Sequence, residues 1–241
     1  MEKLSRRQLL QAAVASGAAL LMSWLGLRPA AASVDPAVPR GPAERRFSWF
    51  GADELAFVNA ALARLIPADE LGPGAREADV AFFIDQQLAG SFGRAETWYM
   101  QGPWQKGTPE QGYQLKLTPA QLYRVAIPAI DAHCRRSYGG KVFAALAAEQ
   151  QDEVLHGLEQ GKIELESAPA KDFFSQFWEN VNEGFFADPM YGGNRDFAGW
   201  KLVGFPGPRY NYLTEIEQYG KTYAMPPVGL LGRDGSALRK G

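Results

Sequence analysis

The stretch Phe173–Gly207, FFSQFWENVNEGFFADPMYGGNRDFAGWKLVGFPG, carries the features that decide the fold. Its first half has large apolar residues at every fourth position: Phe173, Phe177, Val181 and Phe185. That spacing places these side chains on one face of a helix, and Phe174 and Trp178 widen the stripe. A helix with so aromatic a face has to be covered by other elements, so we expect it at the centre of the protein.

The second half of the stretch predicts a break, a tight turn and a short helix. Pro189 biases Asp188 away from helical geometry. The residues Tyr191-Gly192-Gly193-Asn194 tolerate positive φ angles and predict a turn, and a short amphipathic piece, 197–203, follows it. Large rings that carry a polar group favour interfaces. We therefore interpret the turn and Trp200 as a candidate partner-binding site whose rings face outward.

The segment NEGFFADPMYGGNRDFAGWKLVGFPG resembles the signature of the gluconate 2-dehydrogenase subunit 3 family, the small subunits of bacterial membrane-bound, flavin-dependent sugar and polyol dehydrogenases. The resemblance rests on these short motifs: Gly184-Phe185-Phe186, Asp188-Pro189, Tyr191-Gly192-Gly193-Asn194, Gly199-Trp200 and Gly204-Phe205-Pro206-Gly207. Weaker similarity extends it upstream to Asp53.

The resemblance implies a non-catalytic helical subunit. Such a subunit binds and stabilises the FAD-carrying large subunit and escorts it through the twin-arginine (Tat) translocase. A multihaem cytochrome c subunit then takes the electrons. On this reading FAD and haem c belong to partner subunits, and no catalytic, cofactor-binding or metal-binding residue is expected in this chain.

The N-terminus has the pattern of a twin-arginine export signal. Arg6 and Arg7 precede an apolar, alanine-rich run over 12–27, and Ala30-Ala31-Ala32 offers small residues for cleavage. The alternative is a membrane anchor, but a run of about 16 residues is short of the roughly 20 that a spanning helix needs. The sequence therefore predicts a signal peptide over 1–32 and a periplasmic mature chain that does not span the membrane.

The remainder predicts an all-α fold: an irregular helical bundle with long aromatic loops and an extended C-terminal tail. We expect a linker at 33–50, a helical domain at 51–207 and an irregular tail at 208–241, in which Tyr210 and Tyr212 are further candidate partner-binding residues. Upstream of the stretch described above, helices are expected at 52–66, 77–88, 118–138, 141–146 and 149–160. The connection 91–117 packs either on its own core or on a partner.

Charge and cysteine content exclude several functions. Residues 1–32 hold Lys3, Arg6, Arg7, Arg28 and Glu2, so the remainder has 21 basic and 26 acidic residues. An acidic body argues against binding to nucleic acid. The single cysteine, Cys134, cannot form an internal disulfide, a c-type haem attachment site or a cysteine-ligated iron–sulfur cluster. Its setting predicts a small buried side chain.

An alternative reading keeps chemistry in this chain. Glu153 and His156 form a Glu-x-x-His pair, half of the motif found in di-iron bundles, and the second half is missing around His133. A second set of carboxylates, Glu179, Glu183 and Asp188, lies at the aromatic helix. On this alternative the chain is an independent periplasmic helical enzyme or metal-binding protein.

Overall fold

The computed structural model describes residues 46–105, 107–223 and 225–232, and within them the chain is all-α. These residues form six α-helices and no β-strand: α2 (Ala52–Leu65), α3 (Val80–Ala89), α4 (Pro119–Ser137), α5 (Ala148–Glu159), α6 (Ala170–Phe186) and α7 (Ala198–Val203). The predicted fold class is therefore confirmed. The predicted signal over 1–32 lies outside the described residues. No helix in the described ranges is long and apolar enough to cross a bilayer.

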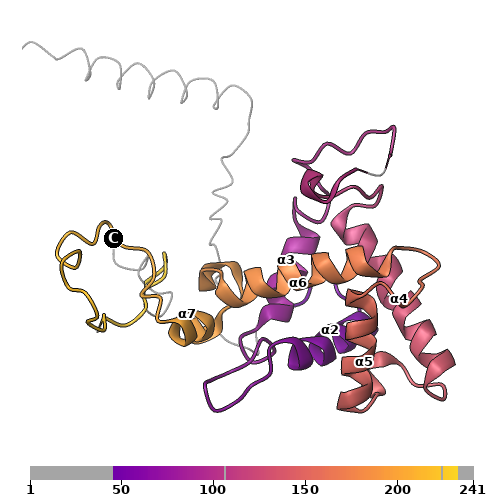
Figure 1. Cartoon of the computed structure of the whole chain (residues 1–241), viewed down its shortest axis with the longest axis horizontal. Coiled ribbons are helices and arrows are strands. Elements are labelled where there is room, and N and C mark those ends of the chain that lie inside the picture. The colour runs from indigo at the N-terminus through magenta and orange to yellow at the C-terminus, as the bar shows by residue number, and fades with distance from the viewer. Residues whose placement is uncertain (1–45, 106, 224, 233–241) are drawn as a thin grey trace, which may run out of the picture. The chain divides into compact units, whose positions relative to one another are not determined.

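Helix α6 is the element on which the others pack. It contacts α3, α4, α5 and α7, as Figure 1 shows for the orange helix that crosses the middle of the molecule. The four residues of its predicted apolar stripe, Phe173, Phe177, Val181 and Phe185, are at most 1% exposed. The stripe is narrower than expected, because Trp178 remains 38% exposed.

The core around α6 is aromatic. Phe173 contacts Tyr123 of α4 and Phe177, with ring centroids 5.3 and 5.8 Å away, and the Phe57 ring of α2 packs at a tilt against Phe143 at 4.8 Å. Tyr123 is fully buried and donates its hydroxyl to Asn180 Oδ1 at 2.8 Å, which satisfies the one polar group that this ring brings inside. Burial raises the pKa of the Tyr123 phenol well above its ordinary value.

Most helix ends form as their residues predict. Thr118 caps α4: its Oγ1 accepts from Gln121 N at 3.3 Å, and Gln121 Oε1 accepts from Thr118 N at 2.9 Å. Gly139 ends α4 and Gly161 ends α5, with φ angles of 63° and 65°. The helix expected at 141–146 is reduced to one 3-10 turn, Phe143–Ala145.

Helices α2 and α3 differ from the prediction in detail. The buried face of α2 is centred on Phe57 and Ala61, whereas Leu55 and Leu65 are only partly buried. Helix α3 begins at Val80, three residues later than expected. The residue before it, Asp79, adopts a left-handed conformation with φ of 59°, which interrupts the predicted helix.

The chain before α2 is fixed to α3 by a buried carboxylate. Asp85 is fully buried, and its two oxygens accept hydrogen bonds from Ser48 N, Ser48 Oγ, Trp49 N and Phe50 N at 2.8 to 3.0 Å. The Arg124 guanidinium lies over the Trp49 ring at 3.7 Å. We expected a flexible linker as far as residue 50. The structure instead shows residues 48–50 held in place.

The connection between α3 and α4 packs largely on itself. Trp98 contacts the rings of Phe92 and Tyr113 at 5.7 and 5.0 Å, and the Tyr113 hydroxyl donates to the Leu117 carbonyl oxygen at 2.6 Å. Burial raises the pKa of Tyr113. Tyr99, at 80% exposed, points away from this cluster. Of the two alternatives for the connection 91–117, packing on its own core is the one that describes the cluster around Trp98.

Candidate partner-binding surface

The turn after α6 is built around the carboxylate of Asp188. One of its oxygens accepts from Met190 N at 3.0 Å and begins the 3-10 helix Pro189–Tyr191. The other accepts from Leu230 N at 2.7 Å, so the same side chain binds the C-terminal tail. Gly192 then adopts φ of 105°, a conformation open mainly to glycine. Asp188 therefore has a structural role that explains its place in the motif.

Asn194 joins the end of α6 to the beginning of α7. Its side chain is fully buried, its Nδ2 donates to the Ala187 carbonyl oxygen at 2.8 Å, and its Oδ1 accepts from Gly199 N at 2.8 Å. Its φ angle is 47°, in the left-handed region that asparagine tolerates better than most residues. The asparagine is thus required for closing the turn.

Three glycines allow the turn to close against α6. A Cβ on Gly193 would lie 2.1 Å from the Gly184 carbonyl oxygen, and one on Gly199 would lie 2.1 Å from the Phe185 carbonyl oxygen. On Gly184 itself a Cβ would meet Phe83 of α3 at 2.8 Å. At each position two parts of the chain approach too closely for a side chain, which explains the glycines in physical terms.

Trp200 does not face outward as we expected. It is 5% exposed, its indole Nε1 donates to the Phe186 carbonyl oxygen at 2.7 Å, and its ring packs on Phe197 and Phe205 with centroids 5.3 and 5.0 Å away. The prediction that this ring is presented to a partner is therefore wrong for the chain as it stands. Through this hydrogen bond and these ring contacts, Trp200 holds α7 against the end of α6.

The other predicted partner-binding residues divide into two groups. Gly193 and Asn194 are buried in the turn, and Gly192 is half-buried. The three tyrosines are exposed: Tyr191 by 50%, Tyr210 fully and Tyr212 by 39%. The turn therefore works as a scaffold, and only the tyrosines are available for contact.

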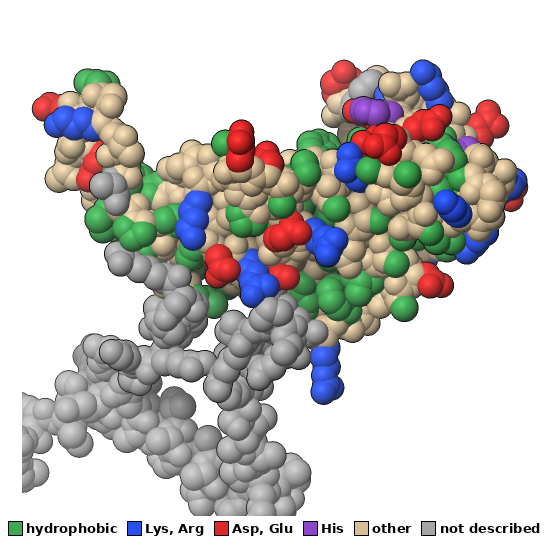
Figure 2. Space-filling model, turned by 90° about the horizontal axis from the view of Figure 1, so that it is seen from below, with side chains coloured by type: hydrophobic (Ala, Val, Ile, Leu, Met, Phe, Trp, Pro, Cys, Tyr) green, Lys and Arg blue, Asp and Glu red, His purple; other side chains and the backbone are tan. Residues whose placement is uncertain are grey.

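Around this scaffold large apolar side chains remain exposed. We call the following set the α7 surface; its members are 39 to 60% exposed and come from the end of α6, the 3-10 turn, α7 and the segment after it: Phe186, Met190, Tyr191, Leu202, Val203 and Phe205. Figure 2 shows one face of the molecule, on which green hydrophobic side chains lie between charged ones. Single exposed apolar residues are ordinary, whereas apolar patches mark interaction sites, so we take these six residues as the candidate contact residues.

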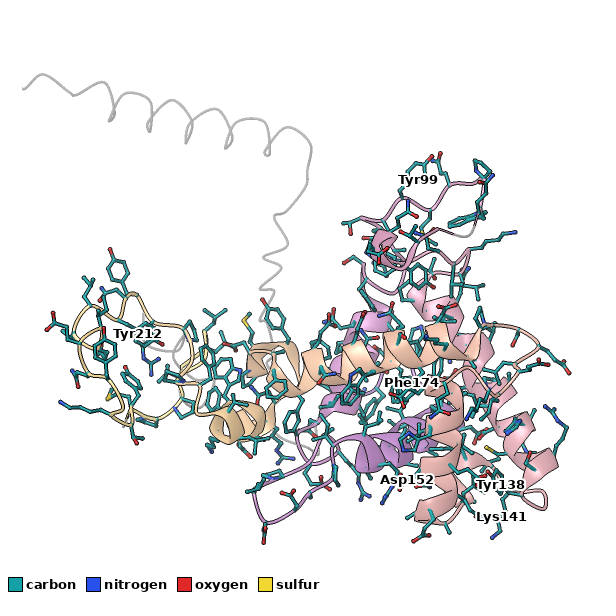
Figure 3. The ribbon with its side chains drawn as sticks, in the orientation of Figure 1. Tyr99, Tyr138, Lys141, Asp152, Phe174 and Tyr212 are labelled. Atoms are coloured by element: carbon teal, nitrogen blue, oxygen red, sulfur yellow. The ribbon has the colours of Figure 1, made fainter. Side chains whose placement is uncertain are left out.

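The C-terminal tail extends this apolar character. Its backbone returns to α7, where Val228 N donates to the Pro206 carbonyl oxygen at 3.1 Å. Tyr212, labelled in Figure 3, packs on Tyr223 at 5.9 Å. Several tail residues are more than half exposed: Tyr210, Leu213, Ile216, Tyr219, Met225 and Leu230. As expected, the described part of the tail contains no helix.

The residues of the alternative reading are engaged elsewhere or open to solvent. Glu153 accepts from the Tyr138 hydroxyl at 3.1 Å, and His156, with its side chain 72% exposed, lies 3.2 Å from Glu159. Glu183 accepts from Asn180 Nδ2 at 3.2 Å. In the described ranges no three His, Cys, Asp or Glu side chains are grouped to hold a metal ion.

Cys134 is also outside any site. It is fully buried in α4, and burial raises the pKa of its thiol to about 12. A thiol with so high a pKa is protonated and unreactive near neutral pH. This confirms the expectation of a small buried side chain.

Together the described residues define a class: an all-α protein with large exposed apolar side chains at and around its last helix. Residues 52–207 match the model of the family described as gluconate 2-dehydrogenase subunit 3, and the chain belongs to that family. The match includes the turn, its three glycines and α7. Searches of curated proteins and of solved structures returned no match.

Proposed function

We propose that this chain is the non-catalytic small subunit of a periplasmic, FAD-dependent sugar or polyol dehydrogenase complex. It binds and stabilises the flavin-carrying large subunit through the α7 surface and the adjoining tail. The observation that carries this proposal is the α7 surface itself, on a chain whose family is named for a dehydrogenase subunit. Large apolar side chains gain free energy when a partner covers them, and exposed tyrosines are frequent interface anchors.

The division of labour within the complex follows from the chemistry of the partners. Covalent attachment of haem c takes two cysteines, and this chain has one. We therefore assign haem c to a multihaem cytochrome subunit, and we assign FAD to the large subunit as the family resemblance implies. In this arrangement residues 51–207 form the body of the small subunit, and the tail from residue 208 adds contact area.

The assembly can be tested by replacing two anchors together, Tyr191→Ala and Phe205→Ala. We expect wild-type tagged chain purified from its native periplasm to carry a co-purifying subunit with flavin absorption. The double variant is expected to lose most of this flavin, since truncating a central anchor costs about 2 kcal/mol or more, roughly a 30-fold change in affinity each. The measurement is flavin absorbance per tagged chain after size-exclusion chromatography.

Tyr99→Ala is the matched control, because it removes a more exposed tyrosine from the 91–117 connection. It is expected to retain the flavin. A colourless wild-type preparation would contradict the proposed complex, and a double variant that keeps its flavin would remove the α7 surface from it.

Export provides a second test. We propose that Arg6 and Arg7, which lie outside the described residues, direct this chain and the bound large subunit to the twin-arginine translocase. Arg6→Lys with Arg7→Lys is expected to leave both chains in the cytoplasm, because the translocase reads the arginine pair and carries folded cargo. Immunoblots of periplasmic and cytoplasmic fractions measure this, with Arg28→Lys as the control. Large subunit still found in the periplasm would refute the escort role.

A further inference from the structure

A pocket lies between α2, α5 and α6, and its lining includes none of the residues of the α7 surface. Its volume is about 320 Å³, and eight residues line it: Arg64, Leu65, Asp152, Leu155, His156, Glu159, Phe174 and Trp178. Asp152 and Phe174 are labelled in Figure 3. Phe186, where the α7 surface begins, lies eight positions after Trp178 on α6, which is about 12 Å along the helix axis. The pocket is therefore a separate site.

One wall of the pocket is a fixed ion pair. Arg64 donates through Nε to Asp152 Oδ1 at 2.8 Å and through Nη2 to Asp152 Oδ2 at 2.6 Å. These hydrogen bonds raise the pKa of Arg64 and lower that of Asp152. Such a bidentate ion pair is among the stronger polar contacts in proteins. An anionic ligand would have to displace Asp152 to reach Arg64, so the pocket disfavours anions.

The remaining charge favours a cation. With histidine counted as neutral, the lining holds one positive side chain, Arg64, and two negative ones, Asp152 and Glu159. Arg64 is matched by Asp152, and Glu159, about half exposed, is paired among the described residues with His156, which is counted here as neutral. Across the pocket, Trp178 supplies an aromatic ring, and aromatic faces attract guanidinium and ammonium groups within about 6 Å.

Size and depth indicate what carries that cation. Pockets for small molecules span about 300 to 1,000 Å³ and bury most of their ligand, so this one is at the lower limit. Its rim is open, since Trp178 is 38% exposed and the His156 side chain 72%. A basic side chain of a polypeptide meets these conditions, because its charged end fills the pocket while the rest of the polypeptide continues outside.

We propose that this pocket receives an arginine or lysine side chain of a partner polypeptide. The charged end lies between Glu159 and the ring of Trp178, and the aliphatic stem packs along Leu65 and Leu155. The site is independent of the α7 surface. It gives the chain a second, charge-selective contact, which stays available when a partner covers the α7 surface.

The test compares two capped tripeptides, Ac-Gly-Arg-Gly-NH₂ and its citrulline counterpart, which has the same shape without the charge. Binding to the full chain is followed by saturation-transfer NMR. We expect saturable binding of the arginine peptide, about tenfold tighter than that of the citrulline peptide. Glu159→Gln is expected to remove most of that difference, and Trp178→Leu is expected to weaken the arginine peptide severalfold.

Two controls make the outcome decisive. Glu166→Gln removes an exposed carboxylate outside the pocket and is expected to leave binding unchanged. Agmatine carries the same guanidinium without a polypeptide, and we expect it to bind no more tightly than the arginine peptide. Equal affinities for the arginine and citrulline peptides, no saturable binding, or full binding to Trp178→Leu would overturn the proposal. Tighter binding of agmatine would assign the pocket to a small cation instead.

Discussion

Replacing Gly193 by alanine is expected to lower the free energy of unfolding by about 3 kcal/mol. The new Cβ would lie 2.1 Å from the Gly184 carbonyl oxygen. The oxygen is a backbone atom and the Cβ is bonded directly to the backbone of the turn, so no side-chain rotation can separate them. The turn would have to lift off α6, and Tyr191, in the same turn, would move with it. Thermal unfolding of the full chain followed by circular dichroism measures the effect. A loss of this size corresponds to a fall of roughly 6 to 12 °C in Tm.

Gly51→Ala is the control for the change in side chain. Gly51 lies at the N-terminus of α2, and its Cβ would be 3.5 Å from Glu54, an ordinary contact distance. We expect this variant to lose no more than about 1 kcal/mol. If Gly193→Ala melts within a degree or two of Gly51→Ala, the turn does not close on α6 as described.

Asp85→Asn is expected to destabilise the protein by about 3 to 4 kcal/mol. Asp85 accepts hydrogen bonds from four donors on residues 48–50. An asparagine keeps one acceptor oxygen and turns an NH₂ group toward the remaining donors. The Phe50 N–H is buried and has no water to replace the lost partner, whereas the Ser48 groups lie nearer to solvent. Urea unfolding, read by tryptophan fluorescence, is expected to show a lower midpoint.

Asp69→Asn provides the comparison. Asp69 also accepts from a backbone N–H, that of Leu71 at 2.8 Å, but this contact is exposed. The change is expected to cost less than about 1 kcal/mol, because water takes over the bond. Equal urea midpoints for the two variants would show that Asp85 does not anchor the segment before α2.

The parts of the fold that depend on local sequence were predictable. The period of Phe173, Phe177 and Phe185 identified the buried face of α6, and the capping box at Thr118 located the start of α4. Each of these signals uses residues within one or two helical turns of one another. Gly161 likewise marks the end of α5 through its own backbone conformation.

The orientation of the turn was not predictable in the same way. The order Gly192-Gly193-Asn194 indicates that positive φ angles are tolerated, but not which side of the turn meets the protein. That depends on the close approach of Gly193 to Gly184, nine residues away on α6. Trp200, which the sequence offered as a partner contact, is internal because its ring packs on Phe197 and Phe205 and its indole donates to the Phe186 carbonyl oxygen.

The structural role of Asp85 was not predicted, although the sequence contains a signal for it. It is the only ionisable residue between Val80 and Leu88, in a helix whose other members are mostly buried. A carboxylate in such a setting needs hydrogen-bond donors. Most of its donors are backbone N–H groups of residues 48–50, more than 30 residues away, in a segment whose composition indicated a linker. The sequence therefore indicated that Asp85 needs hydrogen-bond donors, but not which residues supply them.

The buried thiol of Cys134 has a practical consequence. With a pKa of about 12, roughly one molecule in ten thousand carries the thiolate at pH 8, and the side chain has no solvent contact. Maleimide reagents are therefore expected not to react with Cys134 in the folded protein, so Cys134 need not be replaced before a labelling site is introduced. A cysteine introduced by Tyr99→Cys, or at any other exposed position, is then the only site that a fluorophore or spin probe labels. The distance between this probe and a probe on a partner subunit would report binding of the partner.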